Sequence, residues 1–355
     1  TAYHPVAYPD PYWHHGYTHG VPFNDLNRFH HHGAIRDYND PEQYVQGELT
    51  GGLDDFRTED PGVRADLARI FCALIAATDC DGFRVDAVKH VEPDFLSFLM
   101  PRIYRQAAEL GKTNFLCFGE LVDGQDRLLA RFTGADKMNS MLYFSMFYTM
   151  RDVFGHGRHT ALLSDCLDQQ VQYDPTARGR LVGFLDNHDQ PRSLSGGEMN
   201  NRWNALRVAL TFLYTSPQIP CLYYGTEQGF DGGASPWNRE DMFDGEFEAG
   251  PSVGDNFDTE HILFQWVRKL NDLRTACPAL ATGEATDSMR GGAKYWFPPP
   301  WKLPPPPPVL APPPPMLARA AAPTPAAATP AAAGRMLLPR PCCAPPVSIC
   351  CICWF

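Results

Sequence analysis

Apolar residues follow two different rhythms along the middle of the chain. After Asp60-Pro61, a pair typical of a helix start, they recur at the spacing of one helix face: Val63, Leu67, Ile70, Phe71, Leu74 and Ile75. Short apolar runs near residues 85, 117, 143, 184 and 222 end instead in polar or charged residues, which indicates buried strands. Because helical patterns separate these runs, the sequence predicts an α/β protein with a parallel sheet.

The remaining elements are predicted in the same way. A strand is expected around Leu142–Phe144, followed by a helix-rich stretch that runs to about residue 170. Further helices are expected at 96–110 (interrupted by Pro101), at 203–214 and at 260–273. Residues 1–50 are rich in His, Tyr, Gly, Pro and Asn and show no sustained period. We expect long loops or a small irregular domain there.

Three of the apolar runs stop at a carboxylate, namely Asp86, Glu120 and Asp189. The first two are 34 positions apart and the last two 69. A (β/α)₈ barrel uses about 31 residues for each strand–helix unit. The spacing therefore suits carboxylates at the C-terminal ends of strands n, n+1 and n+3 of such a barrel, around one mouth, where catalytic groups gather.

Arg84 and Asp86 are two positions apart, so on a strand their side chains point to the same side. A guanidinium beside a carboxylate favours the ionised form, which a covalent nucleophile needs. A structural Arg–Asp pair that closes a strand is the alternative for this stretch taken alone.

The stretches Gly82–His90, Phe118–Glu120 and Phe184–Asp189 resemble the nucleophile, acid/base and third-carboxylate motifs of the α-amylase family, glycoside hydrolase family 13. The resemblance extends over roughly residues 20 to 297 and includes Tyr223–Gln228 and Asn238–Met242. It implies a retaining hydrolase that cleaves α-1,4-glucosidic bonds in starch-like or glycogen-like glucans. The alternatives are a transglycosylase of the same family, an inactive glucan-binding fragment, and an unrelated barrel enzyme.

The resemblance also implies roles for individual residues. Asp86 would be the nucleophile and Glu120 the acid/base, while Asp189 would bind sugar hydroxyls and stabilise the transition state. The substrate-binding residues implied beside them are Arg84, Lys89, His90 and His188.

A possible metal site follows from the same resemblance. Leu53–Thr58 is similar to the family's motif near the end of domain B, which makes Asp55 a candidate calcium ligand together with His90. A plain turn aspartate is the alternative. The runs Trp13–His15 and His30–His32 also invite a metal hypothesis, but adjacent histidines rarely share one ligand geometry, so solvated loop side chains are favoured. Aromatic residues such as Tyr8, Tyr12, Trp13 and Tyr17 could stack on sugars or pack within an irregular domain.

In the family's order the five runs would be strands four to eight. The predicted barrel is therefore incomplete, and the chain is expected to start within domain B. We expect a domain B-like segment at 1–59, the C-terminal part of the barrel at 60–297 and a low-complexity tail at 298–355. Strands one to three have no counterpart, so the calcium site would lack a ligand and the sheet would have unpaired edges.

The net charge and the apolar content argue against two classes of binding partner. The net charge of −11 argues against nucleic acid and anionic membrane surfaces. No stretch approaches the ~18 apolar residues of a membrane span.

The tail at 298–355 holds four basic residues, no acidic residue and 19 of the 34 prolines, which indicates a linker or a frameshifted end. Most cysteines before it are expected to be buried small hydrophobes. The sequence does not indicate the oligomeric state. It does not indicate the compartment either, since any signal peptide would precede Thr1.

Overall fold

The computed structural model describes residues 2–6, 20–49, 53–195, 203–244 and 254–282, and the backbone of 349–352. The chain forms two compact units, residues 1–294 with 347–355, and residues 295–346. Only the first contains described residues. The aromatic and histidine residues at 8–17, which the sequence analysis singled out, lie outside the described residues. So do all of the second unit and all of the tail except 349–352.

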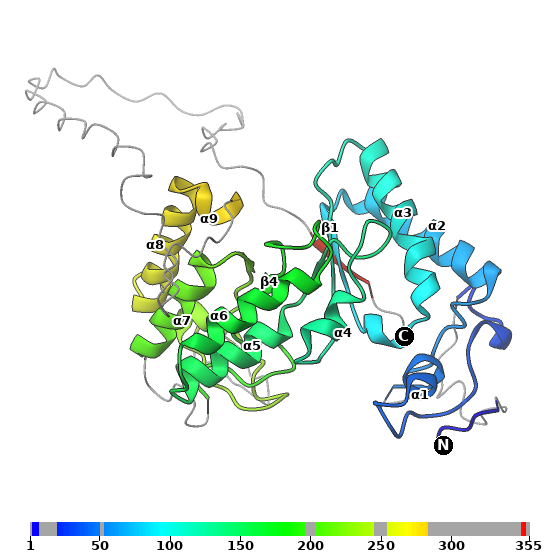
Figure 1. Cartoon of the computed structure of the whole chain (residues 1–355), viewed down its shortest axis with the longest axis horizontal. Coiled ribbons are helices and arrows are strands. Elements are labelled where there is room, and N and C mark those ends of the chain that lie inside the picture. Colours follow the sequence, from blue (N-terminus) through cyan, green and yellow to red (C-terminus); the bar gives the residue numbers. More distant parts are fainter. Residues whose placement is uncertain are drawn as a thin grey trace, which may run out of the picture. The chain divides into compact units, whose positions relative to one another are not determined.

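Five parallel strands follow one another in chain order, close to the positions that the apolar runs predicted. Figure 1 labels two of them, β1 and β4. Their bounds are Gly82–Val85 (β1), Leu116–Gly119 (β2), Ser140–Met141 (β3), Val182–Gly183 (β4) and Ile219–Pro220 (β5). β1 pairs with β2, β2 with β3, and β4 with β5. β3 and β4 belong to two separate sheets, and a single parallel bridge between Leu142, the residue after β3, and Val182 of β4 connects these sheets. Sequential parallel neighbours are the arrangement of a (β/α) barrel wall.

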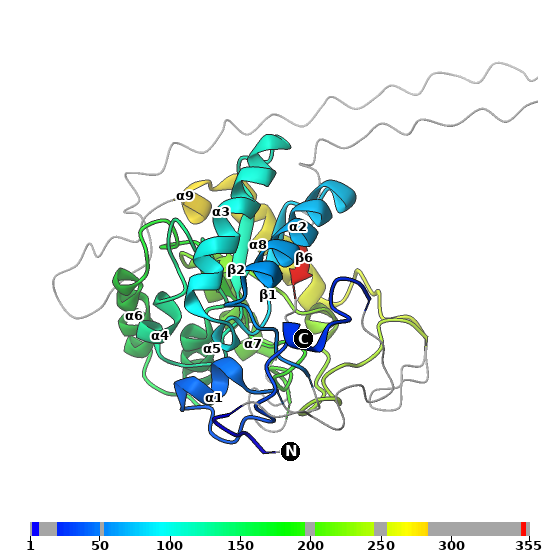
Figure 2. The ribbon, with the colours of Figure 1, turned by 90° about the vertical axis from the view of Figure 1, so that its right-hand side faces the viewer.

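A sixth strand changes one expectation about the sheet edge. The backbone of Ile349–Ile352 (β6) pairs in parallel with β1 on the side away from β2, with Gly82 opposite Ile349 (Figure 2). The prediction that this edge of β1 is unpaired was therefore wrong. A segment of the tail supplies the pairing, so residues 298–355 do not all lie apart from the sheet.

Helices separate the strands. The α-helices are Pro41–Gln46 (α1), Pro61–Thr78 (α2), Pro93–Glu109 (α3), Asp126–Ala130 (α4), Phe144–Met150 (α5), Ala161–Asp168 (α6), Trp203–Thr215 (α7), Ile262–Ala276 (α8) and Ala279–Thr282 (α9). Single turns of other helix types are Leu26–Arg28 (η1), Val88–His90 (η2), Arg151–Gly155 (η3, a π-helix), Gln169–Gln172 (η4) and Thr226–Gln228 (η5). The helices pack in pairs, α2 on α3, α5 on α6 and α7 on α8.

The helix after Asp60-Pro61 forms as the sequence predicted. Asp60 Oδ1 accepts hydrogen bonds from the backbone N–H groups of Gly62 and Val63, at 2.8 and 2.9 Å. These bonds satisfy two donors that a helix start otherwise leaves unpaired. Val63 and Ile75 are fully buried on the face that packs toward the sheet and α3, so α2 fixes the entry into β1.

Two predicted boundaries were wrong. Pro101 does not interrupt α3, because Leu99, Met100 and Ile103 on both sides of it are fully buried and hold the two halves against the core. This burial offsets the cost of a proline in a helix, about 3 kcal/mol. Phe144 begins α5 rather than extending a strand, and its ring packs 5.0 Å from that of Phe184.

The described part of residues 1–59 holds only α1, η1 and isolated bridges, in agreement with an irregular segment. His30 and His32 are nevertheless buried, so the expectation of solvated histidines was wrong for these two. Of the six cysteines before the tail, Cys80, Cys117 and Cys166 are buried, whereas Cys72 and Cys277 are partly exposed and Cys221 is exposed, so the expected burial holds for half of them. Among the described helices, none combines the length and apolar character needed to cross a bilayer.

Candidate active site

Parallel pairing of β1 and β2 brings two carboxyl groups to the same level. Val85 is opposite Gly119, and Glu120 N–H donates to Val85 O at 2.7 Å. Asp86 and Glu120 are the next residues of the two strands, and both emerge at the C-terminal edge of the sheet. Ala87 then takes up the left-handed conformation (φ 46°), which is strained for a residue with a Cβ and turns the chain immediately after Asp86.

Arg84 binds both carboxyl groups. Its guanidinium donates to Asp86 Oδ1 at 2.6 Å, and its second terminal nitrogen lies 2.7 Å from Glu120 Oε2. Glu120 is 8% exposed and Asp86 24% exposed. The strand alternation predicted the first of these contacts, and the register of β1 on β2 produces the second.

The two carboxyl groups have opposite pKa shifts. Burial raises the pKa of Glu120, and its hydrogen bond with Asp86 adds to this effect, so that the pKa reaches about 8 in spite of Arg84. Burial also disfavours the ionised form of Asp86, but the hydrogen bond from Glu120 and the charge of Arg84 outweigh it and lower the pKa of Asp86. One group is therefore protonated and the other ionised at neutral pH.

Asp189 lies in the loop that follows β4. Asn187 Oδ1 accepts the backbone N–H of Asp189 at 2.9 Å and holds this turn. The Asp189 carboxylate lies 3.2 Å from His188 Nε2 and 3.5 Å from a guanidinium nitrogen of Arg239. The negative charge of Asp189 contributes to the raised pKa of Glu120, and the positive charge of a protonated His188 contributes to the lowered pKa of Asp86. The Asp189 turn is therefore within electrostatic reach of the carboxyl pair formed by Asp86 and Glu120.

Buried polar residues behind this turn are ones that the sequence did not single out. Arg192 is 1% exposed, pairs with Glu240 at 3.0 Å and lies with its guanidinium carbon 4.0 Å from the centre of the Tyr223 ring. Asn238 donates to the carbonyls of Asn187 and Gln190, at 3.0 and 2.8 Å. Its place within a family-like segment was the signal that could have identified it.

Lys89 and His90 fasten the turn after β1 to α1. Lys89 Nζ donates to Tyr38 O at 2.7 Å and lies 4.5 Å from the centre of the Tyr44 ring. His90 Nδ1–H donates to Tyr44 O at 2.8 Å, and burial lowers the pKa of the imidazole. Both side chains thus join the predicted barrel to the irregular segment.

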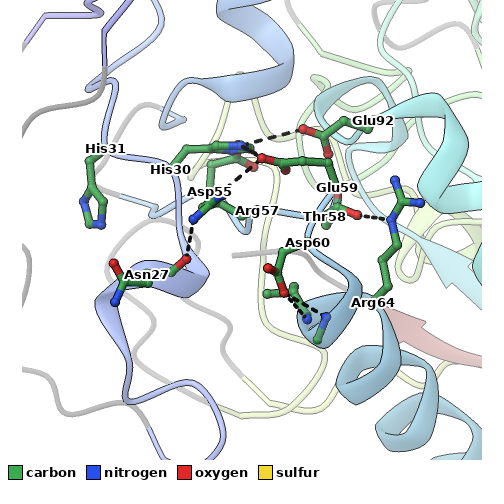
Figure 3. Close-up of polar contacts among 12 residues, drawn as sticks. Asn27, His30, His31, Asp55, Arg57, Thr58, Glu59, Asp60, Arg64 and Glu92 are labelled. Atoms are coloured by element: carbon green, nitrogen blue, oxygen red, sulfur yellow. Dashed lines mark hydrogen bonds and ion pairs between the residues drawn. The ribbon is translucent and has the colours of Figure 1, made fainter.

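Asp55 belongs to a separate group of side chains, which we call the His30 cluster (His30, Asp55, Glu59 and Glu92). His30 Nδ1 is 2.7 Å from Asp55 Oδ2, and His30 Nε2 faces Glu59 and Glu92 (Figure 3). Burial lowers the pKa of His30, but the hydrogen bonds that its ring N–H groups donate to Asp55 and Glu59 outweigh this effect and raise the pKa to about 9.

The side chains of the two predicted calcium ligands, Asp55 and His90, bind other groups in the described structure. Calcium takes 6–8 oxygen ligands, whereas Asp55 binds the buried imidazole of His30 and the His90 ring binds Tyr44 O. Among the described residues, one group of ionisable side chains is suited to hold a metal ion, and it consists of His30, Glu59 and Glu92. Calcium at Asp55 and His90 stays a prediction from the family resemblance.

Comparison with known proteins identifies the fold. Residues 4–272 match a family model described as "Alpha amylase, catalytic domain". The Beta/alpha-amylase of Paenibacillus polymyxa is 33% identical over 285 residues, which are 78% of this chain and 22% of that protein. The cyclomaltodextrin glucanotransferase of Thermoanaerobacterium thermosulfurigenes is 29% identical over 270 residues, 76% of this chain and 34% of that protein.

A solved structure agrees with these matches. The α-amylase of Geobacillus thermoleovorans in complex with acarbose superposes with a TM-score of 0.62 at 27% identity, covering 78% of this chain and 57% of that one. The chain thus spans about a fifth to a third of the two curated relatives, and just over half of the solved chain.

Proposed function

Since the chain belongs to the α-amylase catalytic-domain family, we propose that it carries the active site of a retaining glycoside hydrolase acting on α-1,4-linked glucans of the starch and glycogen type. The observation that supports this most directly is the carboxyl pair. Retaining hydrolysis requires one ionised carboxylate and one protonated carboxylic acid side by side, and Asp86 and Glu120 have lowered and raised pKa values on adjacent strands.

In this proposal Asp86 attacks the anomeric carbon while Glu120 donates its proton to the departing glycosidic oxygen. The products of this step are a glucosyl ester on Asp86, a free sugar hydroxyl and an ionised Glu120. Glu120 then removes a proton from water, which attacks the anomeric carbon and releases Asp86 as a carboxylate. Atoms and charge balance over the two steps, and no metal takes part in either.

Arg84 is suited to both halves of this cycle. It contacts Asp86 and Glu120 at the same time, at 2.6 and 2.7 Å. Before attack the negative charge is on Asp86, and after ester formation it is on Glu120. A fixed cation between them stabilises whichever carboxylate is ionised, without moving.

Asp189 and its neighbours would act on the sugar. The Asp189 carboxylate is 46% exposed and therefore available to accept hydroxyl hydrogen bonds, with His188 as a donor beside it. Lys89 and His90 would hold the glucan only if they exchange their present contacts with α1, so in this chain they are first of all positioning residues for the turn after β1.

The match to a glucanotransferase supports one alternative from the same family. A transglycosylase uses the same carboxyl pair but transfers the glucosyl group from Asp86 to a sugar hydroxyl instead of water. The product pattern separates the two, because new glucans longer than the donor form only by transfer.

The experiment is turnover of maltoheptaose by the full chain, with Asp86→Asn and Asp152→Asn compared at equal folded content. Asp152 is exposed and pairs with His156, so its variant is the matched control. We expect Asp86→Asn to lose at least about 1,000-fold in kcat while glucan binding persists. A slow fluorinated maltosyl donor should add the mass of one fluorinated maltosyl group to the peptide that contains Asp86. Near-normal turnover by Asp86→Asn would exclude the nucleophile role, and a folded chain that binds but never cleaves would favour a glucan-binding fragment.

A further inference from the structure

We propose that the His30 cluster is a binding site for one divalent transition-metal ion of the Zn²⁺ type, with His30 Nε2, Glu59 and Glu92 as ligands. Asp55 would orient His30 from behind instead of binding the ion. The ion and the ligands both differ from the calcium with Asp55 and His90 that the family resemblance implies. The inference does not depend on the proposed glucan chemistry.

The first argument is the contact between Asp55 and His30. Asp55 is 2% exposed, and its Oδ2 lies 2.7 Å from His30 Nδ1. This contact places the imidazole hydrogen on Nδ1 and directs the other nitrogen at Glu59 and Glu92. A carboxylate bound to the far nitrogen of a histidine is the arrangement that orients metal-ligating histidines in zinc sites.

The second argument is the spacing of the ligand atoms. His30 Nε2 is 3.1 Å from Glu59 Oε2, 3.2 Å from Glu59 Oε1 and 3.8 Å from Glu92 Oε1. Ligand atoms at about 2.1 Å from a tetrahedral zinc ion are roughly 3.4 Å apart. These nitrogen–oxygen distances differ from this value by a few tenths of an ångström, and the three ligand atoms all lie within 4.8 Å of one another, so side-chain rotations would bring them around one ion.

The third argument is an unsatisfied atom. Glu92 Oε1 is buried and accepts no hydrogen bond in the described structure, while Thr58 Oγ1–H donates to Oε2 of the same carboxylate. A proton on His30 Nε2 can serve Glu59, but 3.8 Å is too long for a hydrogen bond to Glu92. A metal ion between the three groups would satisfy Glu92 Oε1 as well, which makes a cation larger than a proton the better occupant.

The chemistry of the ligands selects the ion. One imidazole nitrogen with two carboxylates suits zinc and its first-row neighbours, whereas calcium and magnesium prefer oxygen alone. His30 and Glu59 belong to the irregular segment, and Glu92 precedes α3. A bound ion would therefore fasten that segment to the turn that follows Asp86.

The test is metal binding by the full chain after its cysteines are alkylated and resident metal is removed with EDTA. We expect one tightly bound Zn²⁺ per chain, a higher Tm with zinc, and Co²⁺ absorption of the intense tetrahedral type without thiolate charge transfer. Glu92→Gln and His30→Ala should lose the ion and the Tm increase. His31→Ala is the matched control, because the His31 ring binds Leu26 O and points away from the cluster.

Two results would overturn the proposal. One is a wild-type chain that binds no zinc at micromolar concentration. The other is a Glu92→Gln variant, folded by circular dichroism, that binds zinc as the wild type does. Because the readout is metal content and spectrum, neither result affects the conclusion on glucan hydrolysis, and loss of hydrolysis does not affect this one.

Discussion

The carboxyl pair and the His30 cluster both place neighbouring carboxyl groups around a cation, but the cation differs between them. Each holds at least two poorly hydrated carboxyl groups around one positive partner, Arg84 in the first and His30 in the second. A guanidinium keeps its charge at every relevant pH, whereas an imidazole can give up its proton. The first site therefore has a permanent positive charge that stabilises its carboxylates at every relevant pH. The second has a cation that can be exchanged, which is what a metal site needs.

Removal of the permanent cation should have the largest effect. Arg84→Met leaves Asp86 without its ion pair, which raises the pKa of Asp86 and removes stabilisation of both carboxylates. We expect kcat for maltoheptaose to fall by roughly 10²–10³-fold. Arg84→Lys keeps the charge but loses the fork that contacts two carboxyl groups, so it should recover only part of the loss. Unchanged kcat in Arg84→Met would mean that the pair does not need its cation.

The next effect concerns the carboxylate behind the exchangeable cation. Asp55→Asn keeps the shape of the side chain but weakens the bond that orients His30, so zinc affinity should fall by roughly 10–100-fold. Competition with a coloured chelator measures this. Complete loss of the stoichiometric ion at saturating zinc would instead make Asp55 a direct ligand, and unchanged affinity would mean that it orients nothing.

A smaller effect is expected in the pH profile of the carboxyl pair. In the proposed mechanism Glu120 must be protonated to release the leaving group, and its pKa is raised to about 8. Consequently kcat/KM should fall about tenfold per pH unit above that value. The acid limb should lie below the usual pKa of an aspartate, because that of Asp86 is lowered. A substrate with a fluoride leaving group needs no proton, so its glycosylation step should lose the alkaline limb. An alkaline limb that Glu120→Gln leaves in place would belong to another group.

The same comparison explains what the sequence could and could not predict. Asp86 and Glu120 end two apolar runs, and parallel pairing turns that spacing into proximity, so the pair was predictable. The His30 cluster joins residues of an irregular segment to a helix start, and no periodicity describes the path between them. The family resemblance therefore indicated Asp55 as a candidate ligand, but nothing in the sequence indicated its contact with His30.

Burial accounts for the remaining differences. Pro101 looked like a break because propensity is local, but apolar contacts on both of its sides decide the outcome. Arginine and asparagine are mostly exposed, so residue type gave no reason to expect Arg192 and Asn238 in the interior. Their burial depends on how the loop after β4, which contains Gln190 and Arg192, packs against Tyr223 and Asn238, and no short-range pattern in the sequence describes this packing.

The smallest expected effect comes from Asp60, a carboxylate that forms no ion pair with the described residues. Asp60 adjoins Glu59 in sequence, yet its side chain only caps α2 through Gly62 and Val63. Asp60→Asn removes the charge and keeps the cap, so zinc binding and the free energy of unfolding should stay within a few tenths of a kcal/mol. Asp60→Ala removes the cap as well and should cost about 1 kcal/mol in urea unfolding. If Asp60→Asn weakens zinc binding as strongly as Asp55→Asn does, the cluster responds to total negative charge rather than to the geometry around His30. The contrast drawn between the two sites would then concern charge alone.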